Sequence, residues 1–271
     1  MSVMTDQSTP HQSHVLSQDV KMGGSVPFWA VFKRELGLYF RSPVAYAIAF
    51  AMLFFLGVLF NGYLSQALDA QAGVLADAGY MPFLLTFLLF LIAPLLTMRL
   101  LAEEAREGTL EVLMTLPMHE GQFIIGKFLA AWAYYTVLLL LTLVHFLVLN
   151  SIGTPDMGQT FGAYLGAWLY GGAVIAVCMI WTAVTEDQII AAFLSAATVL
   201  VLYLADVAAL FITNTNPQLA EFVRELGLSA HYGSTMAAGI IRLEDILYFV
   251  FMIIGALFIT TRIVETRRWR A

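Results

Sequence analysis

Apolar residues are concentrated in six long stretches, which are separated by short polar links. A helix needs about 20 mostly apolar residues to cross roughly 30 Å of hydrocarbon. By that measure the predicted spans are residues 43–63, 80–98, 123–149, 161–184, 189–212 and 243–261. The last span is short, so we expect Arg262 to extend its side chain toward the interface. The pattern predicts an all-α integral membrane protein with six transmembrane helices.

The segment before the first span has helical periodicity without spanning length. Residues 27–42 place aromatic side chains at helical spacing among basic ones, which predicts an N-terminal interfacial amphipathic helix. Alternatively this segment extends the first span, although Ser42-Pro43 favours a break. Residues 1–26 are rich in Ser, Thr and Gln and predict a disordered cytoplasmic tail.

A second unit outside the spans is predicted at residues 214–242, which we interpret as a small external cap. Asn216-Pro217 is typical of a helix start, with a polar N-cap followed by proline at the first helical position. Gly227 is suited to closing that helix. The six-span apolar region is expected to run over residues 43–263, followed by a basic tail at residues 264–271.

Composition agrees with the membrane class and excludes others. Of the 271 residues 60% are apolar and 12% charged, and the mean hydropathy is +0.81. A net charge of −6 gives no basic field for nucleic acid. The one cysteine, Cys178, cannot form an internal disulfide and lacks the neighbouring ligands of a zinc site. We therefore expect no metal and no cofactor bound by this chain.

The distribution of Lys and Arg predicts the orientation. Cytoplasmic flanks of membrane proteins carry the excess of these residues. Of the 13 in the sequence, only Arg224 and Arg242 fall on the side opposite the termini. Both termini are therefore expected in the cytoplasm, together with the link between spans two and three and the link between spans four and five.

The first of those links, residues 100–117, is an acidic amphipathic segment. Glu103, Glu107 and Glu111 are spaced by four and form one stripe on a helix, with Glu104 beside it. Anionic lipids should repel this stripe, and its like charges also disfavour an isolated helix. The segment therefore favours a protein partner over lipid, the alternative being a solvated loop.

Breaks within this segment give it a compact form. Gly108-Thr109 interrupts the helical pattern and Pro117 ends it, which predicts a helix, a bend and a second helix.

The motif EExxxGTLExLxxLP at residues 103–117, followed by Gly126-Lys127-Phe128, resembles the permease subunits of type 2 ABC exporters. The resemblance covers about residues 28–270, and the stretch SAHYGSTMAAGIIRLEDILYF is similar to the gliding-motility (GldF-like) branch. It implies a cytoplasmic coupling helix at 100–117 that sits in a cleft of a separate ATP-binding cassette subunit, which holds ATP and Mg. It also implies a second permease copy or paralogue, and a place in the bacterial inner membrane.

The coupling residues carried over from this motif are Glu103, Glu104, Arg106, Glu107, Gly108, Thr109, Glu111, Leu113 and Pro117. A possible second ATPase contact is the acidic link at Glu186 and Asp187, for which a plain capped turn is an equal alternative.

Two other motifs are weighed and set aside. Residues 121–127 match most of a phosphate-binding loop, but Phe128 replaces the Ser or Thr that would bind magnesium. Lys127 is instead interpreted as an anchor at the membrane boundary. Glu103-Glu104 with Arg106 approaches an intramembrane protease signature, but the arginine comes two residues early.

Two ionisable residues lie within the predicted spans, His145 and Asp206. Such groups are functional candidates by default, and one interpretation is that the two residues pair and line a substrate path. Alternatively Asp206 only hydrogen-bonds neighbouring helices. Gly162 and Gly166 allow close helix approach, within the subunit or in a dimer.

Together these features predict a permease subunit that exports a substrate when a separate ATPase hydrolyses ATP, and that is not itself an enzyme. The alternatives are a partner-independent secondary transporter or channel, and a membrane anchor for a surface machine. The external links carry no recognition domain, so the sequence does not determine the substrate.

Overall fold

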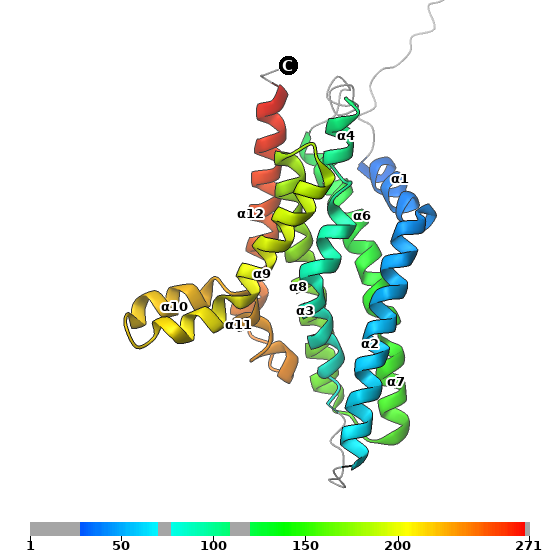
Figure 1. Cartoon of the computed structure of the whole chain (residues 1–271), viewed down its shortest axis with the longest axis vertical. Helices are drawn as coiled ribbons and strands as arrows, with labels where there is room; N and C mark the ends of the chain where they lie inside the picture. Colours follow the sequence, from blue (N-terminus) through cyan, green and yellow to red (C-terminus); the bar gives the residue numbers. More distant parts are fainter. Residues whose placement is uncertain (1–27, 70–76, 109–119, 269–271) are drawn as a thin grey trace, which may run out of the picture.

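In the computed structural model, residues 28–69, 77–108 and 120–268 are described, and within these ranges the chain forms helices and turns without any strand (Figure 1). The helices are α1 (Phe28–Arg41), α2 (Pro43–Asp69), α3 (Tyr80–Thr97), α4 (Ala102–Arg106), α6 (Glu120–Leu141), α7 (Leu143–Ile152), α8 (Met157–Val184), α9 (Gln188–Ile212), α10 (Pro217–Glu225), α11 (Leu228–Tyr232) and α12 (Leu243–Arg268), with a short 3-10 helix η1 (Met236–Ala238).

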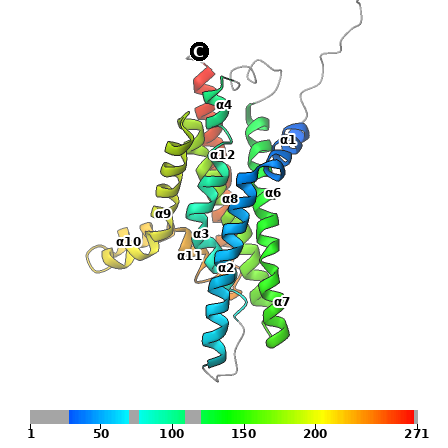
Figure 2. The same cartoon turned by 45° about the vertical axis from the view of Figure 1, so that its right-hand side comes forward.

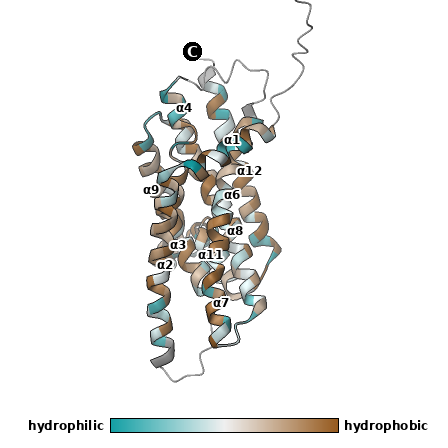
Figure 3. Ribbon diagram, turned by 90° about the vertical axis from the view of Figure 1, so that its right-hand side faces the viewer, coloured by the Kyte–Doolittle hydropathy of each residue, from teal (hydrophilic) through white to brown (hydrophobic). Residues whose placement is uncertain are grey.

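The prediction of six membrane-spanning helices is confirmed. Six helical stretches of the described chain are long and apolar enough to cross a bilayer. Figure 3 shows apolar residues along these spans and more polar ones toward their ends, including α1 and α4. The sixth span is longer than expected, because α12 continues to Arg268 into the region predicted as a basic tail.

Helix α8 forms the centre of the bundle. It contacts α3, α6, α9 and α12, and 78% of an apolar 18-residue stretch of α8 is buried, against 22% in α2 and 17% in α12. Small residues make this possible, since a Cβ at Gly171 would collide with the Tyr135 ring. A Cβ at Gly162 would lie 2.9 Å from Gly239 Cα, so this small-residue face packs within the subunit.

The third predicted span, residues 123–149, is not one continuous helix. It consists of α6 and α7, which are separated at Thr142. The Thr142 N–H donates to Leu139 O at 3.1 Å, and the Thr142 hydroxyl donates to the same oxygen at 2.6 Å. A threonine bound to the carbonyl three residues earlier tightens the turn and interrupts the α-helical ladder.

The amphipathic segment is a separate helix, as predicted. α1 ends at Arg41, α2 begins at Pro43, and α1 lies at a marked angle to α2 (Figures 1 and 2). The buried residues of α1 are Val31 and Glu35, whereas Trp29 is 53% exposed. The face that packs on the bundle therefore differs from the aromatic face that the sequence pattern emphasised.

The cap predicted at 214–242 contains α10, α11 and η1, and it packs on α8 and α9 (Figure 1). Asn216 caps α10 as expected, because its side chain accepts a hydrogen bond from the Leu219 N–H at 3.1 Å. Gly227 follows the end of α10 and also precedes α11, so it separates two short helices.

Candidate functional site

The acidic segment begins with α4, which is fixed to one end of the bundle. Leu100, Leu101 and Ala102 are 4%, 1% and 0% exposed, and α4 contacts α8 and α9. These apolar residues explain how a helix of only one turn keeps its place, since isolated short helices are marginal in water. Residues 109–119 lie outside the described chain, so the predicted coupling helix can be followed only as far as Gly108.

Gly108 ends α4 in a conformation that favours glycine. Its φ is +69°, in the left-handed region, and its N–H donates to Ala105 O at 3.3 Å. The interruption predicted at this position is therefore present. Its partner in the prediction, Thr109, lies outside the described residues.

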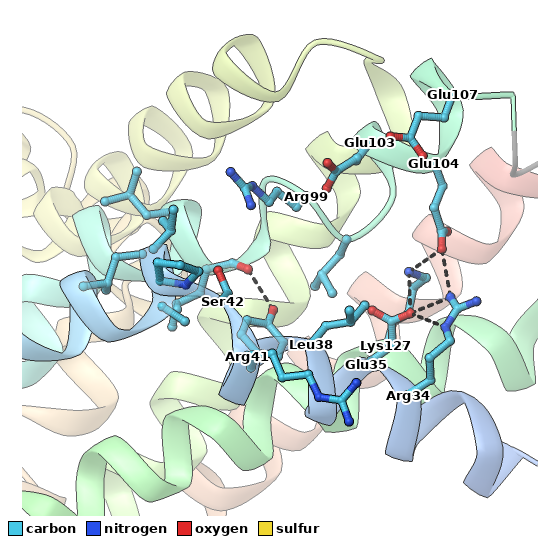
Figure 4. A pocket seen from close by; sticks show the side chains of 18 residues that line it. Arg34, Glu35, Leu38, Arg41, Ser42, Arg99, Glu103, Glu104, Glu107 and Lys127 are labelled. Atoms are coloured by element: carbon cyan, nitrogen blue, oxygen red, sulfur yellow. Dashed lines mark hydrogen bonds and ion pairs between the residues drawn. The ribbon is translucent and has the colours of Figure 1, made fainter.

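A cluster of four charged side chains joins α4 to α1 and α6. We call it the ion cluster; its members are Arg34, Glu35, Glu104 and Lys127 (Figure 4). Glu104 Oε1 lies 2.9 Å from Lys127 Nζ and 3.0 Å from an Arg34 nitrogen. Glu35 Oε1 lies 3.1 Å from Lys127 Nζ and 2.6 Å from Arg34. Each carboxylate thus meets both cations.

The ion cluster is largely removed from solvent. The side chains of Lys127, Glu35 and Glu104 are 2%, 6% and 15% exposed, and only that of Arg34 reaches 50%. Buried charges are tolerated when they are paired and hydrogen-bonded, and here two positive charges balance two negative ones. Partial burial acts to lower the pKa of Arg34, but the carboxylates of Glu35 and Glu104 outweigh it and raise that pKa above its ordinary value.

The interpretation of Lys127 as a boundary anchor is wrong. Its ammonium points into the protein and also lies 5.0 Å from the centre of the Phe123 ring. Sequence reasoning missed Arg34 and Glu35 altogether. One signal was available, since Glu35 shares a face of α1 with Val31 and Tyr39, at a spacing of four.

Tyrosine hydroxyls attach α1 and the start of α2 to the same region. Tyr39 donates a hydrogen bond to Leu96 O at 2.7 Å, and Tyr134 donates to Ala45 O at 2.8 Å. The rings of Tyr39 and Tyr134 stack with centres 5.0 Å apart. Burial, together with the nearby Glu35 carboxylate, raises the pKa of Tyr39, so this hydroxyl stays protonated as a donor.

The structure divides the predicted acidic stripe into two groups. Glu104 reaches into the ion cluster, whereas Glu103 and Glu107 point elsewhere from α4 (Figure 4). Glu103 is partly buried, and Glu107 and Arg106 are exposed. Glu104 is therefore placed for an internal contact, whereas Glu103, Arg106 and Glu107 form the surface of α4. Glu111, Leu113 and Pro117 lie outside the described residues.

The second acidic link lies at the same end, between α8 and α9 (Figure 1). The Asp187 side chain accepts hydrogen bonds from Ile189 N–H at 2.8 Å and Ile190 N–H at 3.1 Å, so it caps α9. Glu186 and Asp187 are both exposed. The capped turn is thus present, and its exposed acids lie near α4, which contacts both flanking helices.

His145 and Asp206 do not pair. The His145 ring packs edge-on against Phe60, with centres 4.9 Å apart, and its Nδ1 lies 3.0 Å from Thr142 O. Asp206 lies 4.0 Å from Arg224 of α10. The helices that carry the two residues, α7 and α9, are on opposite sides of the bundle (Figures 1 and 2). The expected shared path is therefore not formed by this pair.

A metal centre is not found in the described ranges, where no three His, Cys, Asp or Glu residues gather closely enough. Cys178 is free and buried in α8.

Comparison with known proteins gives consistent matches. The family model described as ABC-2 family transporter protein matches residues 39–202. A protein of Pseudomonas aeruginosa named "Probable ABC transporter permease protein NosY" is 30% identical over 156 residues, which cover 54% of this chain and 55% of that protein. A protein of the same name from Stutzerimonas stutzeri is 27% identical over 241 residues, covering 79% of this chain and 86% of that protein.

Proposed function

This chain belongs to the ABC-2 family of transporter proteins, and from that premise we propose that it is the permease subunit of an ATP-driven exporter. In this proposal residues 100–117 form the element through which a separate ATPase subunit, carrying ATP and Mg, acts on the spans. The observation that carries it is the attachment of α4, whose Glu104 pairs with Lys127 of α6 and Arg34 of α1.

Free energies of the expected size support the transmission of movement from α4 to the spans through the ion cluster. Switching a two-state protein from 1:99 to 99:1 takes about 5.5 kcal/mol. Separating one partner from a buried charge pair costs about 3–5 kcal/mol. The ion cluster contains several such contacts, so a displacement of α4 would move α1 and α6 with it before the cluster opened.

The surface of α4 supports a partner of opposite charge. Glu103 and Glu107 are not held in the ion cluster, and the exposed acids Glu186 and Asp187 lie at the same end. We infer that this acidic surface binds a basic cleft of the ATPase subunit and that Gly108 shapes the approach.

Further parts of the proposal concern the assembly. The poorly buried faces of α2, α9 and α12 leave room for lipid and for a second permease copy or paralogue. The excess of Lys and Arg near the termini favours a cytoplasmic position for both, in the bacterial inner membrane. Residues 229–249 favour the gliding-motility branch, whereas both relatives described above are named NosY.

The experiment measures coupling in proteoliposomes that contain the permease and its cassette ATPase. Charge reversal by Glu103→Lys with Glu107→Lys should abolish co-purification of the ATPase and its stimulation by the permease. The matched control is Glu221→Lys, an exposed acid on α10 in the cap, which should leave both unchanged. Unaltered coupling in the double variant, or transport in vesicles without any ATPase, would contradict the proposal.

A further inference from the structure

A large pocket lies in the angle between α1 and α2 and is closed by the end of α3 and by α4 (Figure 4). Its volume is about 820 Å³, within the range of pockets that bind small organic ligands. The pocket lies where α2 begins at Pro43 and α3 ends at Thr97. This is the level at which an embedded bundle meets lipid headgroups, whichever way the protein is oriented.

One part of the pocket is apolar and opens outward. Its wall includes Ile48, Leu95 and Leu96, which are buried or partly buried. At the rim, Leu38 and Val44 are 55% and 39% exposed. Exposed aliphatic residues beside a span with only 22% burial face the bilayer. An acyl chain can therefore enter from the side and lie against this wall.

The other part of the pocket carries two arginines, Arg41 and Arg99, that form no ion pair with a residue of the described ranges. Of its three arginines, only Arg34 forms an ion pair within the described residues, whereas Arg41 and Arg99 are exposed and form none there. Ser42 lies beside them in the lining. Guanidinium groups bind phosphate through paired, charge-assisted hydrogen bonds. Arg99, which lies on the α4 side of the pocket (Figure 4), thus provides a site for a phosphate group next to the apolar wall.

The acidic residues of the lining determine which charge the rest of a phosphate-bearing headgroup can carry. Glu103 and Glu107 also line it, on the side of α4. They would repel a second anionic group and would accept hydrogen bonds from an ammonium. The four members of the ion cluster balance one another in charge. The charged residues that remain in the lining are the basic Arg41 and Arg99 and the acidic Glu103 and Glu107. That arrangement complements a zwitterionic headgroup.

We propose that this pocket binds an aminophospholipid of the phosphatidylethanolamine type. Its phosphate lies on Arg99, its ammonium is directed toward Glu103 and Glu107, and one acyl chain lies along Ile48 and Leu95. Glu103 and Glu107 also belong to the surface proposed to bind the ATPase, but lipid binding is measured on the permease without any ATPase, so failure of this proposal is distinguishable from failure of the coupling function.

The test is native mass spectrometry of the full chain, purified in detergent and titrated with phosphatidylethanolamine. Arg99→Gln should weaken binding about tenfold or more, because charge-assisted hydrogen bonds are lost. The matched control is Arg262→Gln, an exposed arginine of α12 that does not line the pocket, and it should leave binding unchanged.

A second variant tests the apolar wall while keeping the arginines. Ile48→Trp should fill the space of the acyl chain and reduce binding to a similar extent, with helix content verified by circular dichroism. Inorganic phosphate at the same concentration should not displace the lipid. The proposal is overturned if both variants bind the lipid as the parent chain does, if phosphate alone displaces it, or if phosphatidylglycerol binds equally well.

Discussion

The two ends of the bundle hold their buried carboxylates in different ways. At one end Glu35 pairs with Lys127, which is 92 positions later in the chain, and both belong to the ion cluster. At the other end Asp245, with a side chain 4% exposed, meets the Nδ1 atom of His231 at 2.9 Å, only 14 positions away. The first arrangement connects separate helices, whereas the second fastens the cap to the start of α12.

The cations of the two ends differ as well. The ion cluster joins two basic and two acidic side chains, and each carboxylate contacts both basic groups. The His231 ring relies in addition on stacking against Tyr248, with centres 3.8 Å apart, and on its Nε2, 3.1 Å from Glu225 O. The comparison indicates that the end proposed to transmit movement is held by ion pairs between separate helices, while the cap is held by local stacking and hydrogen bonds.

The sharpest test of this contrast is removal of the central cation. Lys127→Met should destabilise the protein by about 3–5 kcal/mol, because Glu35 and Glu104 lose their buried cation and keep only the half-exposed Arg34 between them. Unfolding in mixed micelles measures the change. Lys127→Arg is the conservative control and should retain most of the stability. Strictly additive effects of Lys127→Met and Glu104→Gln in a double-mutant cycle would show that the cluster does not act as a unit.

At the opposite end a smaller effect is expected from His231→Phe. The substitution keeps an aromatic ring against Tyr248 but leaves the buried Asp245 carboxylate without its hydrogen bond, which costs about 1–3 kcal/mol. Hydrogen exchange of α11 measures the loosening of the cap. Adding Asp245→Leu should recover part of the loss, and no recovery would show that the carboxylate is not the cause.

The bend after α4 should be sensitive to side-chain size for conformational reasons alone. At Gly108 a Cβ would meet open space, but the φ of +69° disfavours an L side chain by about 1–2 kcal/mol. Gly108→Ala should therefore alter the protease sensitivity of this bend, with Gly108→Asn tolerated better. Equal behaviour of the two variants would argue against the left-handed conformation.

The smallest effect should come from a surface pair of the cap side. Arg242 and Glu244 lie 3.2 Å apart, with side chains 55% and 68% exposed. Exposed pairs contribute roughly 0–1 kcal/mol, so Arg242→Gln should hardly change unfolding. A loss as large as that of Lys127→Met would remove the distinction between buried and surface pairs on which the comparison rests.

Several features were predictable because they depend on local sequence. Spanning length, the break at Ser42-Pro43, the N-cap at Asn216 and the bend at Gly108 each follow from a short stretch of residues. Thr142 shows the limit of this approach. Hydropathy alone does not report a side chain that bonds its own backbone, so residues 123–149 were predicted as one uninterrupted helix.

The candidate site was predictable in part. The acidic stripe located the exposed surface of α4, but the inward direction of Glu104 depends on where α1 and α6 pack. For His145 and Asp206 the sequence suggested a contact that is absent. Both are ionisable residues within predicted spans, but their helices lie on different sides of the bundle.

The sequence by itself determined that this protein is a six-span membrane protein, helical throughout its described residues, with a separate amphipathic helix before the first span, an acidic link and the segment called the cap. Only the tertiary structure decided that Lys127 is buried, that Arg34 and Glu35 meet Glu104, and that two arginines face an apolar pocket. The reason is physical. Periodicity and capping act over a few residues. The partner of a buried charge is instead set by the packing of helices whose paired residues are 70 and 92 positions apart in the sequence.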